Sequence, residues 1–451
     1  MMTDLAGRIR YAAAAAILSG VVCSGCGVLP QGTLPSLPFT AEESGAETAG
    51  AAGNAPTTGG STGNAGAAGS SAGNAFAEED SAGDAAREKA PGEAASGTEE
   101  AGQNAGSEAS VLEPAPTYEA EALSDGSSTY GYHLLTAEGQ KIYDEVLSAV
   151  RERRTVTVST LDKDKLNQVY DCVTADHPEL FYISGYTYTK HSVMDKLLSI
   201  SFEGNYEMTA RQQEDAQKIV DDYTARCFDD LPADADQYET AKYLFDYIVT
   251  HTDYDTAAED NQTILSAMQN GRSVCSGYAK SFQFLLNKAG IPCTLVTGTV
   301  DKSPHAWNLV LLDGDYYFFD VTFGDASYLG SDVNRAVTGY EYFGVTSEET
   351  GRTHTADGRI PLPVCRAEAD NYYVHENARL QAYDTQRIAE LARKAAAEGA
   401  GILRLQAATA PLYDELLDQL IGQQQIYNFL PGVRSLNYIR DKDMRTLTFC
   451  F

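Results

Sequence analysis

The feature that most limits the fold of this chain is a long segment without core-forming residues, from 27 to 117. It consists mainly of Ala, Gly, Ser, Thr and Glu, and Phe76 is the one aromatic residue between 41 and 115. Gly-Asn-Ala recurs there at 53, 63 and 73. Such a composition cannot bury enough apolar surface to offset the entropy of ordering the chain. We therefore expect a disordered linker with an end-to-end reach of roughly 50 Å.

Residues 1–26 have the pattern of an export signal. Two arginines precede an apolar run, 11–22, that is too short to span a bilayer comfortably. Cys26, preceded by Ser-Gly, resembles the acylated cysteine of bacterial lipoproteins. The position three before it is usually Leu and here is Cys23, so an uncleaved anchor helix over 11–29 is the alternative. We expect an exported protein anchored to the cell membrane as a lipoprotein, with its body facing outside.

The composition of the whole chain excludes several classes of protein. Hydrophobic residues make up 43% of the 451 residues, so the chain is not wholly disordered. The net charge of −31 repels phosphate backbones, which argues against a nucleic-acid partner. Eight cysteines are too few for a disulfide scaffold.

Hydrophobic periodicity after the linker predicts three folded units, at 118–230, 231–345 and 366–451. In the first, a small α+β unit, we expect helices over 136–150, 160–177 and 209–228 and strands over 155–159, 181–188 and 197–202. In the second we expect helices over 238–248 and 275–289, then strands over 293–300, 305–312 and 316–322. In the third, a small α/β unit, we expect strands over 372–375, 402–406 and 445–450 and helices over 384–398 and 411–421.

Cys275 is the first candidate for a chemical role, because a loop is expected to become a helix at this residue. The first turn of a helix has unpaired N–H groups and the positive end of the helix dipole, and both favour a thiolate. The residue shares an apolar stripe with Tyr278 and Phe282, so it is expected to point inward. The alternative is a buried, inert thiol.

His305 and Asp320 are expected to lie on one face of a hairpin. Asp313-Gly314 predicts a two-residue type I′ turn. With this turn Trp307 pairs with Asp320, and Asp320 becomes the diagonal neighbour of His305 on the same face. The carboxylate can then fix the imidazole tautomer while the other ring nitrogen faces a thiol.

Each of these residues has a structural alternative when it is taken alone. A lone His is usually a surface residue or a hydrogen-bonded core residue, and a lone Asp in a strand is usually an edge residue. A zinc site built from Cys275, His305 and Asp320 lacks paired ligand spacing and a fourth ligand. The joint spacing therefore favours a catalytic Cys-His-Asp set, with no metal and no cofactor.

Three stretches around these residues form an ordered set of motifs. They read SVCSGYAK at 273–280, HAWN at 305–308 and DVTFGD at 320–325. In this order and at these separations they resemble the transglutaminase-like superfamily in its bacterial secreted form, whose members have G-V-C-x-G-Y-A, H-A-W-N and D-x-T-W. The resemblance covers about residues 235–330, and short pieces at 176–181 and 261–262 are also similar to bacterial relatives.

The resemblance implies a papain-like core with Cys275 as nucleophile, His305 as base and Asp320 as the orienting acid. Two positions depart from the family pattern. Phe323 stands where relatives usually have Trp. This difference alters the wall of the cleft but leaves the roles of the three triad residues unchanged. Ser276 stands where Gln is frequent, so an amide contribution from that position is absent.

Two more residues are candidates for the cleft. Gln262 lies upstream of the nucleophile, as the oxyanion-hole Gln of papain-like proteases does, and its side-chain amide could donate to an oxyanion. The alternative for Gln262 is a polar loop residue. Trp307, the one Trp of the chain, is expected to pack over His305.

Together these features predict an α+β fold with a papain-like, transglutaminase-like core, flanked by small α/β units and preceded by a long disordered N-terminal tether. The expected function is that of a monomeric cell-surface cysteine enzyme of acyl-transfer type, which acts on protein or cell-wall peptide substrates. Release of the acyl group by water or by an amine stays open. A non-catalytic surface binding module that retains the fold is one alternative, and a solute-capturing lipoprotein is another.

The linker makes the first testable prediction. Mild proteolysis of the exported protein should cut first between residues 30 and 115, because unstructured backbone fits a protease cleft without prior unfolding. N-terminal sequencing should find a compact, resistant fragment that begins near residue 118. Amide protons of this region that are protected in hydrogen exchange would contradict the prediction.

Overall fold

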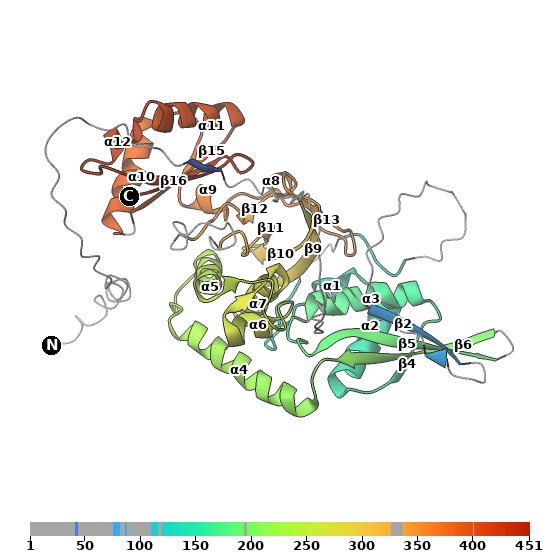
Figure 1. Ribbon diagram of the computed structural model, residues 1–451. Coiled ribbons are helices and arrows are strands. Elements are labelled where there is room, and N and C mark those ends of the chain that lie inside the picture. The colour runs from blue at the N-terminus through green and yellow to red at the C-terminus, as the bar shows by residue number, and fades with distance from the viewer. Residues whose placement is uncertain are drawn as a thin grey trace, which may run out of the picture. The chain divides into compact units, whose positions relative to one another are not determined.

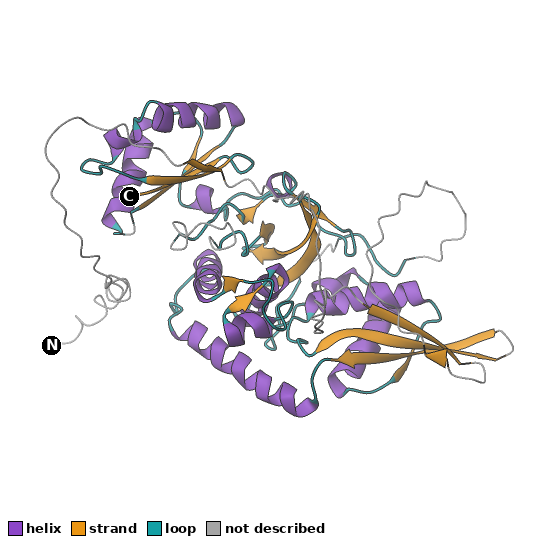
Figure 2. Cartoon of the chain, viewed as in Figure 1, coloured by secondary structure: helices purple, strands orange, loops and turns teal. Residues whose placement is uncertain are grey.

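The computed structural model describes residues 41–43, 75–81, 86–87, 110–115, 120–193, 196–325, 337–399 and 401–451 (Figure 1). The predicted signal, Cys26 and most of the predicted linker lie outside these residues. None of the helices described there is both long enough and apolar enough to cross a membrane. Figure 2 shows the mixture of helices and strands that the sequence predicts, which confirms the α+β class.

The segment 120–229 has the helices and strands that its periodicity predicts. The helices are α1 (Tyr130–Leu134), α2 (Ala137–Glu152), α3 (Lys163–Asp176) and α4 (Ala210–Asp229), and the strands are β4 (Val156–Val158), β5 (Ile183–Val193) and β6 (Lys196–Tyr206). Helix α3 begins at Lys163, three residues later than expected, because Asp162 is its cap and the Asp162 carboxylate accepts the N–H of Asp164. Helix α1 is short and is not expected from the sequence.

Three short strands lie within the stretch predicted to be a linker: β1 (Ala41–Glu43), β2 (Ala75–Ser81) and β3 (Ala86–Arg87). Strand β2 pairs in parallel with β5, and β1 pairs in parallel with β16 (Asn437–Asp441). An open sheet edge can accept an extended chain through main-chain hydrogen bonds, whatever its side chains. Residues 110–115, also predicted to be linker, pack on the first unit instead, because Val111 is buried and its carbonyl accepts the N–H of Thr136 at 2.8 Å. The remaining residues of this stretch lie outside the described residues, so their disorder stays a prediction.

The end of α3 is fixed by the buried carboxylate of Asp176. It accepts hydrogen bonds from the N–H groups of Gly131 and Tyr132, at 2.7 and 2.8 Å, and from the hydroxyls of Ser128 and Tyr143. Four donors on one buried carboxylate offset only part of its lost hydration, and burial raises the pKa of Asp176 to about 6. Asp176 is the first residue of one of the pieces similar to bacterial relatives, and its role here is structural.

The same end of α3 is bonded to the elements that carry the candidate site. The carbonyl of Ala175 accepts the side-chain amide of Gln283, at 2.6 Å, and the hydroxyl of Thr294, at 3.3 Å. Gln283 lies on α7 (Cys275–Lys288) and Thr294 on β9 (Cys293–Val300). One cluster of buried hydrophobic side chains also runs through both parts of the chain. The first segment therefore supports the back of the site.

The segment 237–356 contains a five-stranded sheet in the order β12-β11-β10-β9-β13. Its other strands are β10 (Ser303–Leu312), β11 (Asp315–Phe319), β12 (Phe343–Val345) and β13 (His354–Ala356). The helices are α5 (Gln237–His251), α6 (Ile264–Asn270), α7 and α8 (Ser347–Thr350), and β7 (Asp253–Tyr254) pairs with β8 (Arg272–Ser273). Helix α7 contacts β9 and β10, and Cys275 at its start packs against a small cluster that includes Leu295 of β9 and Ala306 of β10.

The β10–β11 hairpin has the predicted turn and register. Both turn residues have positive φ angles, 47° for Asp313 and 89° for Gly314, as a type I′ turn requires. Leu312 consequently pairs with Asp315, and the ladder continues to Asn308 and Phe319. Strand β11 ends one residue before Asp320, where the sequence predicts a strand to 322.

The segment 372–450 is a second α/β arrangement. Its helices are α9 (Tyr372–His375), α10 (Thr385–Ala397), α11 (Ala410–Leu416), a π-helical turn (Leu417–Gly422) and α12 (Ile426–Phe429). Strands β14 (Arg379–Leu380), β15 (Ile402–Ala407) and β17 (Thr446–Cys450) form one sheet with β16 and β1. The strand predicted over 372–375 is wrong, because Asn371 caps a helical turn by accepting the N–H groups of Tyr373 and Val374.

Candidate active site

Cys275 is the first residue of α7, as predicted, and this helix begins without a side-chain cap. Its N-cap residue is Val274, whose side chain accepts no hydrogen bond. The other described helices of ten or more residues, α2, α3, α4, α5 and α10, each begin with a Thr or Asp cap that accepts an N–H group. The first turn of α7 therefore keeps N–H groups that can stabilise a thiolate or an oxyanion.

A loop packs against this helix start and fixes it in place. The N–H of Val274 donates to the carbonyl of Asn261 at 3.3 Å, and the Ser273 hydroxyl donates to the same carbonyl at 3.0 Å. A Cβ atom on Gly277 would lie 1.9 Å from the Ser273 Oγ and 2.8 Å from the Thr263 carbonyl. This close approach explains why the motif has Gly two residues after the cysteine.

Gln262 lies in this loop, and the structure gives its main chain a clear role. Its carbonyl accepts the ammonium group of Lys280 at 3.0 Å. Burial lowers the pKa of Lys280 to about 8, and the Cys275 side chain opposes this effect. Gln262 itself is half-buried. The oxyanion role of its side chain stays a prediction, whereas Lys280 is a neighbour of the thiol that sequence reasoning missed.

His305 and Asp320 are in direct contact, as the hairpin predicts. The Nε2 atom of His305 lies 2.6 Å from the Oδ2 atom of Asp320, and their side chains are 5% and 2% exposed. The N–H of Asp320 donates to the carbonyl of Tyr342 at 2.9 Å, which holds Asp320 beyond the end of β11. Since Nε2 is used by Asp320, Nδ1 is the ring atom left for the Cys275 thiol.

The pKa values of this pair point to a charged imidazole. Burial alone would lower the pKa of His305, but the Asp320 carboxylate and the Cys275 side chain outweigh burial and raise it to about 10. Burial would likewise raise the pKa of Asp320, but hydrogen bonds and charge from His305 and His354 hold it below its usual range. An imidazolium beside a thiol is the arrangement that stabilises a thiolate.

A second histidine, His354, binds the same carboxylate oxygen. Its Nε2 atom lies 3.0 Å from Asp320 Oδ2, and its side chain is 1% exposed. Sequence reasoning missed this residue, which lies 34 positions after Asp320 on the three-residue strand β13. No motif or periodicity marks it in the sequence, and only the pairing of β13 with β9 brings it to the site.

Aromatic rings enclose the two histidines. The Trp307 ring is stacked on His305, with centroids 6.2 Å apart and planes at 19°, which confirms the expected packing. Phe323 meets His305 edge-on at 5.5 Å. His354 lies 4.9 Å from the ring of Trp307 and 4.9 Å from that of Tyr342. This enclosure keeps water away from the Asp320 carboxylate and strengthens its interactions.

The same atoms could also hold a metal ion. Ligand atoms of His305, Asp320 and His354 lie within 4.8 Å of one another, and all three residues are buried. Two imidazoles and a carboxylate are common ligands of zinc. This set differs from the zinc alternative considered from the sequence, because His354 replaces Cys275.

Comparison with known proteins supports the resemblance seen in the motifs. Residues 225–321 match the family model described as the transglutaminase-like superfamily. This range contains Cys275, His305 and Asp320. The chain therefore contains a transglutaminase-like core, as its motifs predict. A search of the curated proteins finds no match.

Solved structures also align with parts of the chain. Among them are a TGase (12% identity, 31% of this chain and 50% of that chain, TM-score 0.23), a candidate cysteine protease from Cytophaga hutchinsonii (15%, 30% and 61%, 0.21) and a candidate protease from Parabacteroides distasonis ATCC 8503 (9%, 30% and 39%, 0.18). The chain spans about half the length of the first of them. Because these TM-scores are low, we draw no conclusion from the three structures and rely on the family match.

The six described cysteines allow a direct test of this site. Burial raises the pKa of the thiols of Cys172, Cys227, Cys293, Cys365 and Cys450. Brief treatment of the native protein with iodoacetamide at pH ~6 should therefore alkylate Cys275 first, as peptide mapping can measure. The substitution His305→Ala should slow this labelling at least about tenfold, because the imidazolium is lost. Equal labelling of all six thiols would contradict the site.

Proposed function

We propose that this protein is a cysteine enzyme of acyl-transfer type, with Cys275 as nucleophile, His305 as general acid and base, and Asp320 as the orienting carboxylate. The observation that carries the proposal is that the buried His305 ring contacts the Asp320 carboxylate at 2.6 Å and also hydrogen-bonds the side chain of Cys275, at the uncapped start of α7. The three residues come from a helix, a strand and the end of a hairpin, so packing of the core brings them together.

The reaction follows from this arrangement. The Cys275 thiolate attacks the carbonyl carbon of an amide, and N–H groups at the start of α7 stabilise the oxyanion, with the Gln262 amide as an additional donor. His305 donates its Nδ1 proton to the departing amine, which leaves a thioester on Cys275. Water or a second amine then attacks the thioester and gives its proton to His305, and the thiolate is released.

The substrates we propose are proteins or cell-wall peptides. An exported protein that is held at the cell membrane by a lipid on Cys26 meets these molecules first. Hydrolysis and transamidation share every step up to the thioester. They differ only in which nucleophile reaches it, so we leave both within the proposal.

A metal-dependent hydrolase is the second candidate, because His305, Asp320 and His354 converge. In that case a metal ion would supply the Lewis acid and Cys275 would be dispensable. The hydrogen bonds from both imidazoles to Asp320 favour the thiol enzyme, since each Nε2 atom needs a proton to donate to a carboxylate. Activity that EDTA abolishes and that Cys275→Ala retains would establish the metal enzyme instead.

An activated ester tests the proposal without knowledge of the natural substrate. With p-nitrophenyl acetate we expect a burst of about one equivalent of p-nitrophenol, together with an acetyl group on the peptide that contains Cys275. The burst should disappear in Cys275→Ala, persist in the control Cys293→Ala, and slow about tenfold or more in Asp320→Asn. Adding a primary amine during deacylation then measures the partition between hydrolysis and transamidation.

The opposite result is equally clear. If the native, folded protein forms no acetyl-Cys275, or acetylates other residues as readily, the thiol is not activated. The non-catalytic binding module would then be the better account of this core.

A further inference from the structure

The Asp320 carboxylate has four hydrogen-bond donors, and only one of them is the histidine that the proposed mechanism uses. Its Oδ1 atom accepts the N–H groups of Thr322 and Phe323, at 2.9 and 3.3 Å. Its Oδ2 atom accepts Nε2 of His305 at 2.6 Å and Nε2 of His354 at 3.0 Å. The oxygen that orients His305 is therefore shared with a second imidazole.

Hydrogen-bonded side chains behind His354 hold its ring in place. The Nδ1 atom of His354 lies 2.8 Å from the Thr353 hydroxyl, which lies 2.7 Å from the hydroxyl of Tyr342. An ionised Asp320 only accepts, so Nε2 of His354 must carry a proton. Donation from Tyr342 to Thr353, and from Thr353 to Nδ1, then gives every group in this series a partner.

The last residue of this series of hydrogen bonds, Tyr342, also contacts the main chain of Asp320. The carbonyl of Tyr342 accepts the N–H of Asp320 at 2.9 Å, so one residue holds both ends of the arrangement. Burial raises the pKa of Tyr342, and the carboxylates of Asp441, Asp320 and Asp443 raise it further, so its hydroxyl stays protonated as a donor. Asp320 is thus held through its backbone and through three side chains in series.

Gly298 makes room for this arrangement. It pairs with His305 on one side and with Ala356 of β13 on the other. A Cβ atom at residue 298 would lie 2.1 Å from the Thr355 carbonyl and 2.8 Å from the Trp307 ring. The absent side chain lets β13 and the Trp307 ring approach closely, which brings His354 within reach of Asp320.

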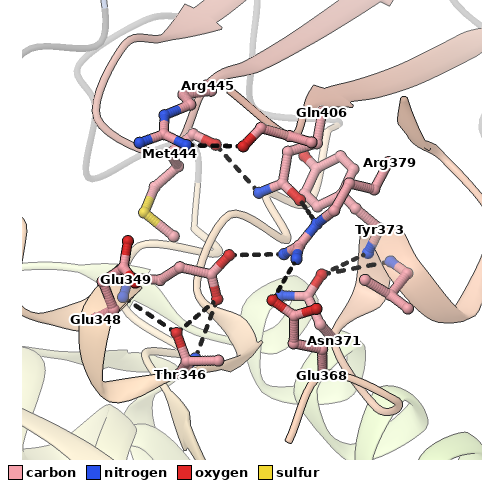
Figure 3. A network of polar contacts seen from close by, with 12 residues as sticks. Thr346, Glu348, Glu349, Glu368, Asn371, Tyr373, Arg379, Gln406, Met444 and Arg445 are labelled. Carbon is pink, nitrogen blue, oxygen red and sulfur yellow. Dashed lines mark hydrogen bonds and ion pairs between the residues drawn. The ribbon is translucent and has the colours of Figure 1, made fainter. Parts of the chain in front are cut away.

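Residues of the C-terminal part of the chain contact α8 and the turn that precedes His354. Figure 3 shows Glu349 of α8 bonded at one oxygen to Thr346 and at the other to Arg379 of β14, at 2.6 Å. The Arg379 and Glu349 side chains are 10% and 7% exposed, so this ion pair is buried. Arg352 also donates to the carbonyl of Asp443 at 3.0 Å. These contacts fix α8 and the turn that leads into β13.

We propose that His354 is a positioning residue of this active site: its Nε2–H group holds the Asp320 oxygen that orients His305 towards Cys275. This inference rests on the proposed cysteine mechanism and adds a residue that the motifs do not contain. Loss of this donor leaves Asp320 with one fewer bond to its ionised form, so the carboxylate binds protons more readily and orients His305 less well. The thiolate–imidazolium pair should then form over a narrower range of pH.

The test compares two replacements of His354 by the pH profile of Cys275 alkylation, measured with EDTA present. His354→Phe keeps an aromatic ring between Trp307 and Tyr342 but removes the donor. It should lower the alkylation rate at pH ~6 about tenfold. It should also move the midpoint of the acidic limb of the profile to higher pH, by about one pH unit. His354→Gln restores an N–H donor. Its alkylation rate should therefore lie within about threefold of that of the native protein, and its midpoint within about 0.3 pH unit.

Each other outcome bears on a distinct claim. The positioning role is overturned if His354→Phe does not shift the acidic limb, or if His354→Gln alkylates as slowly as His354→Phe. Either result leaves the proposed function intact. If His305→Ala also has no effect on alkylation, the proposed function itself fails. Should His354→Phe not fold, Thr353→Val provides the same test, because it removes only the hydroxyl that donates to Nδ1, and it should shift the limb in the same direction by a smaller amount.

Discussion

The arrangement of the site depends on the buried carboxylate of Asp320. An ionised carboxylate away from water is unfavourable unless its oxygens accept hydrogen bonds, and here two main-chain N–H groups and two imidazoles supply them. These donors hold the pKa of Asp320 below its usual range. The carboxylate therefore stays ionised at neutral pH, and its charge keeps His305 in one orientation with the second ring nitrogen free for a thiol.

The start of α7 provides the complementary condition. Most long helices of this chain use a Thr or Asp side chain to satisfy their first N–H groups, whereas α7 begins after Val274. An acidic cap at that position would repel a thiolate and would occupy the donors that an oxyanion needs. The main-chain carbonyl of Asn261 supports the helix start instead, by accepting the Val274 N–H and the Ser273 hydroxyl, which leaves the first turn without a capping side chain.

The parts of this site that follow local rules could be predicted from the sequence. The Asp313-Gly314 turn sets the register of the hairpin, and the register places His305 beside Asp320. His354 could not be found in this way, since its contact depends on how β13 lies along β9 rather than on any local pattern. The error at 372–375 has a similar cause, because the sequence Tyr-Tyr-Val favours a strand by composition and the Asn371 cap imposes a helical turn.

The central claim is that His305 is an imidazolium paired with Asp320 and with the Cys275 thiolate. The most direct measurement is the ¹⁵N chemical shift of its ring nitrogens as a function of pH, in protein labelled at its seven histidines and assigned with His305→Gln. The account predicts that both nitrogens are protonated at pH 7 and that the charge is lost only well above the ordinary value of about 6.5. A neutral ring at pH 7 that titrates near 6.5 would contradict it.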